Sequence, residues 1–119
     1  MKQYKIIIAY KATELLSECD LTEKEQWDLY KLRKILRSHY DFQQQREDAV
    51  REKYASFIDE KGMLQGEKAQ EFAKDINAIG DLEVEIEEFV KPEIRIIKGI
   101  TYKIIEPLED FIDFLPPAE

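Results

Sequence analysis

The side chains that most often carry out chemistry in enzymes are few in this chain and stand far apart in it. His39 is the only histidine and Cys19 the only cysteine among 119 residues. A thiol nucleophile with a histidine base needs the two side chains within hydrogen-bond reach of each other, and nothing in the sequence supports such a meeting. We therefore expect Cys19 to be a small core residue, and we predict no catalytic residue.

Carboxylate pairs offer a second kind of chemistry. Glu67 and Glu71, and likewise Glu71 and Asp75, stand one helical turn apart, a spacing at which two carboxylates can hold Mg²⁺ or act as acid and base. With 26 acidic residues in the chain, such pairs also arise by chance. The sequence has no Cys/His cluster for zinc and no glycine-rich phosphate loop. We predict neither a metal site nor a cofactor.

The longest uninterrupted segment of the chain predicts a single long helix over about residues 22–58. Thr22 and Glu25 form a capping-box pattern at its start, and no Pro or Gly interrupts the segment before Gly62. Apolar residues with three- and four-residue spacing mark one face of this helix and are candidates for an interaction surface: Leu29, Leu32, Leu36, Tyr40, Val50, Tyr54 and Phe57.

Six consecutive polar residues, QQQRED at positions 43–48, interrupt this apolar stripe. Three interpretations stay open: a solvated stretch where the helix leaves its own core, a polar layer that fixes the register of a helix pair, or a kink. At ~1.5 Å per residue the helix spans roughly 50 Å, more than the width of a compact domain of this size. We expect one end to project or to pack against a partner.

Shorter helices flank the long one. Apolar residues at helical spacing predict a helix over about 7–18, and the isoleucine run within residues 3–8 leaves a short strand open as an alternative. Gly62 is expected to end the long helix. A further helix is expected over about 67–79, with Gly80 as its C-terminal cap.

After Gly80 the apolar residues recur at every second position. In DLEVEIEEF, residues 81–89, the apolar side chains alternate with Glu83, Glu85 and Glu87, which predicts a half-buried strand with one acidic face. Such a row of glutamates discourages aggregation between sheet edges. It could equally form an acidic binding edge for a basic partner, so these glutamates are also candidate interaction residues.

The remaining residues predict a second short strand over 93–98 and then an ambiguous segment. Residues 100–114 fit either a hairpin strand or a helix that Thr101 caps and Pro107 weakens, and we favour the helix. Taken together, the elements predict an α+β fold that is mostly helical, with one long central helix, two or three shorter helices and a small C-terminal two-stranded sheet. We expect a single domain over residues 1–119, with a helical part over 1–80.

Charge and composition restrict the class of partner. The net charge of −8 disfavours direct binding to nucleic acid or to an anionic membrane. Basic residues concentrate in 30–55 and acidic ones in 59–90, a polarity that suits protein–protein contact. A single cysteine, the lack of a signal-peptide pattern and the lack of a membrane-spanning segment favour a reducing, cytoplasmic location.

Three runs of the chain resemble a family of small phage and prophage proteins without assigned activity: LTEKEQWDLYKLRKILRSHYDFQQQREDAVREKYASF, EKAQEFAKDINAIGDLEVEIEEF and ITYKIIEPLEDFI. The matching motifs lie at 52–54, 71–77 and 108–112, whereas KPEIRIIKG and Pro107 depart from the family pattern. The resemblance implies an α+β fold and a phage setting in the cytoplasm of a bacterial host. It brings no catalytic residue with it.

We therefore hold three hypotheses. The first is a phage-type accessory or assembly protein that binds a phage or host protein without catalysis, with self-association through the apolar stripe left open. The second is an acidic inhibitor of a host nucleic-acid-binding enzyme or defence complex, which would use Glu83, Glu85 and Glu87. The third is a carboxylate–metal enzyme.

Overall fold

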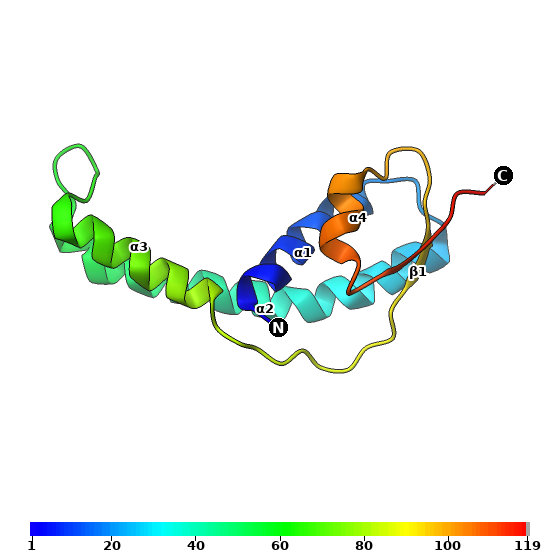
Figure 1. Cartoon of the computed structure of the whole chain (residues 1–119), viewed down its shortest axis with the longest axis horizontal. Helices are drawn as coiled ribbons and strands as arrows, with labels where there is room; N and C mark the ends of the chain where they lie inside the picture. The colour runs from blue at the N-terminus through cyan, green and yellow to red at the C-terminus, as the bar shows by residue number, and fades with distance from the viewer. Residues whose placement is uncertain (119) are drawn as a thin grey trace.

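The computed structural model describes residues 1–118 and contains seven elements in this part of the chain (Figure 1): α1 (Gln3–Ser17), α2 (Glu23–Tyr54), η1 (Ala55–Phe57), α3 (Gly66–Gly80), β1 (Glu93–Arg95), α4 (Tyr102–Leu108) and β2 (Asp113–Leu115). The fold is α+β and mostly helical, as predicted. The molecule measures 58 × 29 × 19 Å, and its radius of gyration is 17.9 Å. A compact chain of this length would have a radius of about 13–14 Å.

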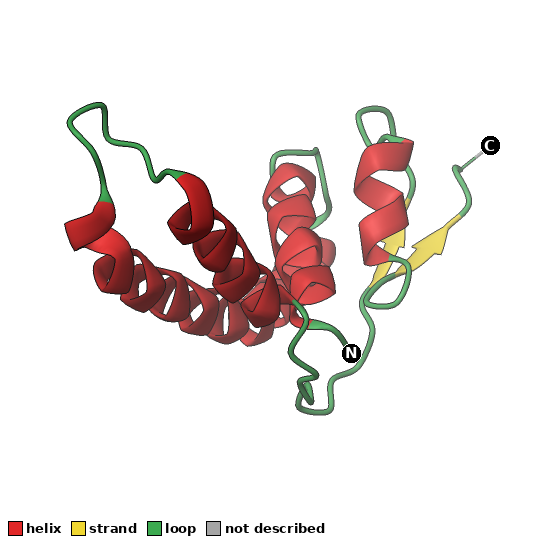
Figure 2. Ribbon diagram, turned by 60° about the vertical axis from the view of Figure 1, so that its left-hand side comes forward, coloured by secondary structure: helices red, strands yellow, loops and turns green. Residues whose placement is uncertain are grey.

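The elongation comes from α2, which passes through two parts of the molecule (Figures 1 and 2). We call one part the body: it contains α1, the first half of α2, α4 and the strands. We call the other part the arm: it contains α2 from about residue 43, η1, the loop 58–65 and α3, which runs back antiparallel along α2. The expected projection of one end of the long helix is therefore seen.

The long helix begins as the capping box predicts. The backbone N–H of Glu25 donates to Thr22 Oγ1 (3.2 Å), and the N–H of Thr22 donates to Glu25 Oε1 (2.9 Å). The predicted range of about 22–58 is confirmed, since α2 passes into the 3₁₀ turn η1, which ends at Phe57. Gly62 is not the residue that ends the helix. Gly62, at φ +78°, lies in the following loop, where a left-handed backbone suits glycine.

The polar stretch at 43–48 remains helical and coincides with the passage from body to arm. The buried residues of α2 are Leu29, Leu32, Leu36 and Tyr54, with none between 37 and 53. Gln43 Nε2 donates to Glu47 Oε1 within the same helix (3.1 Å). The structure agrees with the first interpretation, in which the helix leaves its own core at this point.

The first helix starts earlier than predicted, and the alternative of a strand at residues 3–8 is wrong. Ile6 and Ile7 are buried in α1, so tertiary packing outweighs the β-propensity of the isoleucine run. Extended structure is confined to Lys2, which forms an isolated antiparallel bridge with Glu83.

The third helix occupies nearly the predicted range, but Gly80 is not its cap. Gly80 belongs to α3, and Asp81 follows as the C-cap. A Cβ atom at Gly80 would lie 3.4 Å from Tyr4 Cβ. Gly80 therefore lies where α3 passes close to α1, at a distance that a Cβ atom could still occupy in van der Waals contact.

The acidic segment DLEVEIEEF at residues 81–89 does not form the predicted strand. Residues 82–92, which we call the strap, run extended alongside α2, and only Glu83 makes a bridge (yellow in Figure 1). The alternation describes the burial in part, because Val84 and Ile86 pack against the core while Glu85 and Glu87 are exposed, but Leu82 is exposed as well.

The sheet instead pairs β1 with β2 in parallel, with Ile94 opposite Phe114. The predicted strand over 93–98 shortens to Glu93–Arg95. The prediction of a helix within 100–114 is correct for α4 only, and the hairpin alternative is wrong. Thr101 makes no side-chain cap, and α4 ends one residue after Pro107, which supplies no backbone donor.

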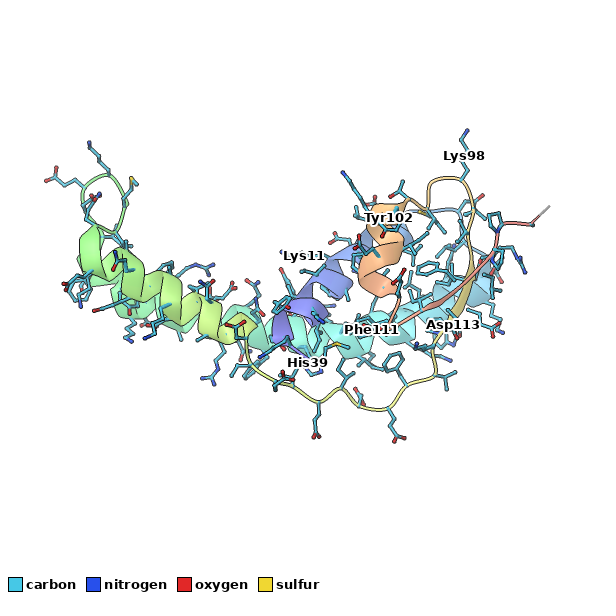
Figure 3. All side chains as sticks on the ribbon, viewed as in Figure 1. Lys11, His39, Lys98, Tyr102, Phe111 and Asp113 are labelled. Carbon is cyan, nitrogen blue, oxygen red and sulfur yellow. The ribbon has the colours of Figure 1, made fainter. Side chains whose placement is uncertain are left out.

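The core lies in the body and draws on every element there. Phe89 of the strap stacks on Phe111, with ring centroids 6.1 Å apart, and Phe111 sits beneath α4 (Figure 3). Most of the buried apolar side chains form one cluster: Ile6, Ala9, Ala12, Leu16, Leu21, Leu29, Leu32, Leu36, Ile94, Ile100, Ile104, Leu108, Phe111 and Ile112.

Candidate protein-interaction site

The first half of the apolar stripe on α2 is covered by the chain itself. Leu29, Leu32 and Leu36 are each at most 2% exposed. Tyr40 is half-buried, and its ring centroid lies 4.9 Å from that of Tyr10 on α1. The three leucines offer no open surface, so contact with a second copy through them would require the body to unfold, and Tyr40 is only partly open.

The second half of the stripe is covered by α3, except at its end. Val50 is half-buried, and Tyr54 is buried, its ring edge-to-face with Phe72 at 5.7 Å between centroids. Phe57 is 49% exposed. Of the seven candidate stripe residues, Phe57 alone has a largely open side chain.

Phe57 is joined at the end of the arm by two residues that the sequence reasoning missed, Ile58 and Met63, which are also about half exposed. We call these three residues the arm-end cluster. The sequence did contain a signal for this cluster: several apolar residues surround Gly62. A solvated turn is normally built from polar residues. A hollow of about 400 Å³ beside the cluster is lined by Arg51, Tyr54, Ile58, Gly62, Met63, Leu64, Ala69 and Phe72.

A hydrogen-bond network holds the two arm helices together beneath this cluster. Tyr54 Oη donates to Asp75 Oδ2 (2.7 Å), and Lys53 Nζ contacts the same oxygen at 3.2 Å. The hydrogen bond from Tyr54, followed by that from Lys53, lowers the pKa of Asp75, and the same carboxylate raises the pKa of Tyr54. The network fixes α3 against α2.

The loop is ordered by Asp59. Its Oδ1 accepts the backbone N–H groups of Lys61 (2.9 Å) and Met63 (3.0 Å), and its Oδ2 accepts from Gln65 Nε2 (3.1 Å). These hydrogen bonds, that from Met63 first, lower the pKa of Asp59. Met63 is therefore held in an exposed position by a structured turn.

The charges around the cluster are largely paired. Lys68 Nζ lies 4.5 Å from the ring centroid of Phe57 and 3.2 Å from Glu71 Oε2. Arg51 contacts Asp48 at 2.9 Å and Glu47 at 3.4 Å. Glu60, Lys61 and Glu67 are exposed and form no ion pair within residues 1–118, so the apolar cluster lies between paired charges on the helices and unpaired charges of both signs at the loop.

The fold does not bring the single histidine and the single cysteine together. Gln3 Nε2, at the start of α1, donates to the backbone oxygen of His39 (2.8 Å). Cys19, beyond the other end of α1, lies 3.7 Å from the Gly99 oxygen. The 15 residues of α1 separate the two sites, which corresponds to about 22 Å. A Cys19–His39 dyad is not formed.

The carboxylate pairs on α3 are occupied by lysines. Glu71 pairs with Lys68 and Asp75 with Lys53, each at 3.2 Å. Glu67 is exposed. Across residues 1–118 no three His, Cys, Asp or Glu side chains gather in a way that could hold a metal ion.

The acidic row lies on the strap, on the body side of the molecule. Glu83 Oε2 contacts the N-terminal ammonium at 3.1 Å, and its Oε1 contacts Lys2 at 3.4 Å. The hydrogen bonds from these two cations lower the pKa of Glu83. Glu85 and Glu87 are exposed and form no ion pair within the described part of the chain.

Comparison of the chain with protein-family models, curated protein sequences and solved structures finds no match. None of the helices described over residues 1–118 has the length and apolar character needed to cross a membrane.

Proposed function

We propose that the protein acts without catalysis, as an accessory or assembly protein that binds another protein through the arm-end cluster. The observation that carries this proposal is the exposure of three large apolar side chains, Phe57, Ile58 and Met63, together at the end of a projecting arm. Single exposed apolar residues are common on protein surfaces, but a grouped set is typical of interaction sites.

The partner that fits this site is a protein of phage or host with an apolar cleft. Three side chains are too small a surface to supply the roughly 1,200–2,000 Å² of a stable interface between two arm ends. They are instead suited to insertion into a concave surface, where a few buried apolar anchors carry most of the binding energy. Because the three anchoring side chains are apolar and salt screens only interactions between charges, we expect this binding to depend only weakly on salt.

The phage setting and the bacterial cytoplasm form part of this proposal. They rest on the resemblance of three sequence runs to small phage and prophage proteins. The interaction chemistry rests on the arm alone and does not depend on that setting.

The test compares a triple variant of the arm-end cluster with a double variant of residues on α1 that are about as exposed. Phe57→Ser, Ile58→Ser and Met63→Ser remove the cluster, and Ile8→Ser with Leu15→Ser on α1 is the matched control, since these two residues are 50% and 53% exposed. A partner captured by the wild-type chain is purified, and its affinity for each chain is measured by calorimetry at low and high salt.

We expect the arm variant to bind at least tenfold more weakly and the control variant to bind like wild type. Circular dichroism shows whether both variants keep their helices. Equal affinity of the arm variant and wild type, or binding that high salt abolishes, would contradict the proposal.

A second candidate function, the acidic inhibitor, is favoured by the free glutamates of the strap. Glu85 and Glu87 alternate on an extended chain about 6–7 Å apart, so they form a regular row of negative charge. An inhibitor of this kind would release nucleic acid from a basic groove. Glu85→Lys with Glu87→Lys should abolish that release, and the variant leaves the Glu83 ion pairs of the fold in place.

A further inference from the structure

The outer surface of α2 in the body carries aromatic and cationic side chains far from the arm end. Trp27 and Tyr30 are 58% and 56% exposed, and their rings stack with 5.6 Å between centroids and 19° between planes. Lys31 Nζ lies 5.4 Å from the Trp27 ring centroid. Lys34 and Arg37 continue this surface one turn further along the helix. We call these five residues the aromatic–basic face.

The cations of this face form only long ion pairs, or none, within the described chain. Lys31 and Arg37 approach Asp28 and Asp41 only at 3.9 Å. Lys34 forms no ion pair within residues 1–118. An exposed pair of stacked aromatic rings beside free cations is a surface that an acidic partner would cover, since aromatic anchors are enriched at the centres of interfaces.

The strap supplies the complementary surface beside this face. A hollow lined by Asp28, Lys31, Leu32, Ile35, Glu88, Phe89 and Val90 lies between them. Glu85, Glu87 and Glu88 are exposed without an ion pair in the described chain, and Val90 is 93% exposed. The strap thus combines free negative charge with an open apolar residue.

The two surfaces also agree in length. Residues 27–37 of a helix extend about 15 Å, and residues 85–90 of an extended chain extend about 17 Å. Each copy carries both surfaces next to each other. A twofold rotation can therefore place the face of each copy on the strap of the other, which is the self-complementary arrangement of a closed dimer.

We propose that two copies of the chain associate in this way, with the aromatic–basic face of each against the strap of the other. Nucleic acid is a poorer occupant, because the glutamates of the neighbouring strap would repel phosphates and the whole chain carries a net charge of −8. The dimer leaves both arm ends free, so it is independent of binding through the arm-end cluster.

The experiment uses charge reversal on each surface separately. Lys34→Glu with Arg37→Glu reverses the face, and Glu85→Lys with Glu87→Lys reverses the strap. The mass of each chain is measured by light scattering and sedimentation over a range of concentration and salt. Trp27 is the only tryptophan, so its fluorescence reports burial of the face directly.

We expect the wild-type chain to dimerise more weakly as salt rises, and each reversed variant to lose at least tenfold in dimer affinity. An equimolar mixture of the two reversed variants should form a heterodimer and shift the Trp27 emission to the blue, because both contacts then join opposite charges. The arm variant described above should dimerise like wild type, which separates this proposal from the proposed function.

A monomeric wild-type chain at low salt and high concentration would overturn the proposal. So would a dimer that neither reversal weakens, or a mixture of reversed variants that stays monomeric. If Trp27 of a monomeric chain responds instead to a single-stranded oligonucleotide, the face binds nucleic acid and the dimer is excluded.

Discussion

The two halves of α2 share one helix and one apolar periodicity, yet the rest of the chain treats them differently. In the body, Leu29, Leu32 and Leu36 are enclosed by a core that draws on α1, α4 and the strands. In the arm, α3 alone covers the stripe, and Tyr54 is the only fully buried residue of α2 there. The periodicity specifies a helix with one apolar side, and the elements packed on that side decide between core and interaction surface.

This difference implies unequal local stability. Regions with few buried apolar contacts open at lower free energy than the core of the same protein. The arm depends on a few aromatic contacts and on the Tyr54–Asp75 hydrogen bond, whereas the body has a contiguous apolar cluster. We therefore expect the arm to open without the body.

The largest effect is expected in the body core. Leu36→Ala removes a side chain with no exposed surface, and such truncations cost about 2–5 kcal/mol of unfolding free energy. Urea denaturation followed by circular dichroism measures this loss. A change below about 1 kcal/mol would mean that the core relaxes around the cavity, and the contrast between body and arm would fail.

A smaller and more local effect is expected in the arm. Phe72→Ala removes the half-buried ring that packs against Tyr54, and we expect a loss of about 1–3 kcal/mol. Hydrogen exchange should speed up for amides of α3 and the end of α2. If the amides of α1 lose protection to the same degree, the arm and body unfold as one unit.

The start of α2 gives a third, milder test. Thr22→Ala removes the acceptor for the Glu25 N–H and should cost about 1 kcal/mol, whereas Thr22→Ser should restore most of it. Glu25 Oε2 also accepts the Arg95 N–H of β1 at 2.8 Å. Chemical denaturation of Glu25→Ala should therefore show a greater loss than Thr22→Ala.

The smallest effect should depend on pH. Tyr54→Phe removes the hydrogen bond that lowers the pKa of Asp75. A lowered pKa in the folded state stabilises the fold above the pKa of the unfolded chain, and this contribution disappears as the pH falls through the folded-state value. Thermal melts of Tyr54→Phe and wild type should differ at neutral pH and converge in acid. Tyr102→Phe, at a 68% exposed position, is the control.

Local signals in the sequence were sufficient for α2 and α3, but not for the start of α1 or for the choice between helix and hairpin at α4. Thr22 and Glu25 marked the start of α2, the uninterrupted run marked its length, and the spacing on α3 marked that helix. Each of these signals lies within a few residues of the structure that it specifies. The mostly helical class followed from them, whereas the two-residue period after Gly80 marks the strap and not a strand of the sheet, which pairs β1 with β2.

Contacts between residues far apart in the sequence could not be predicted in the same way. The pairing of Ile94 with Phe114 depends on residues that α4 brings together, and the helical spacing of Phe111, Ile112 and Leu115 concealed a turn and a strand. The open surface at Ile58 and Met63 depends on where α3 begins relative to the end of α2. The candidate stripe therefore contained Phe57 but not the two residues beside it.

The antiparallel bridge between Lys2 and Glu83 has a consequence for the order of synthesis and folding. Arm contacts such as Tyr54–Asp75 close loops of about twenty residues, since the two lie 21 apart in sequence. The body joins Lys2 to Glu83 and needs β2 near the end of the chain. Short loops close at lower entropic cost, so we expect the arm to form on the ribosome before the body closes. Pulse-labelled exchange during refolding should then protect α3 no later than α4.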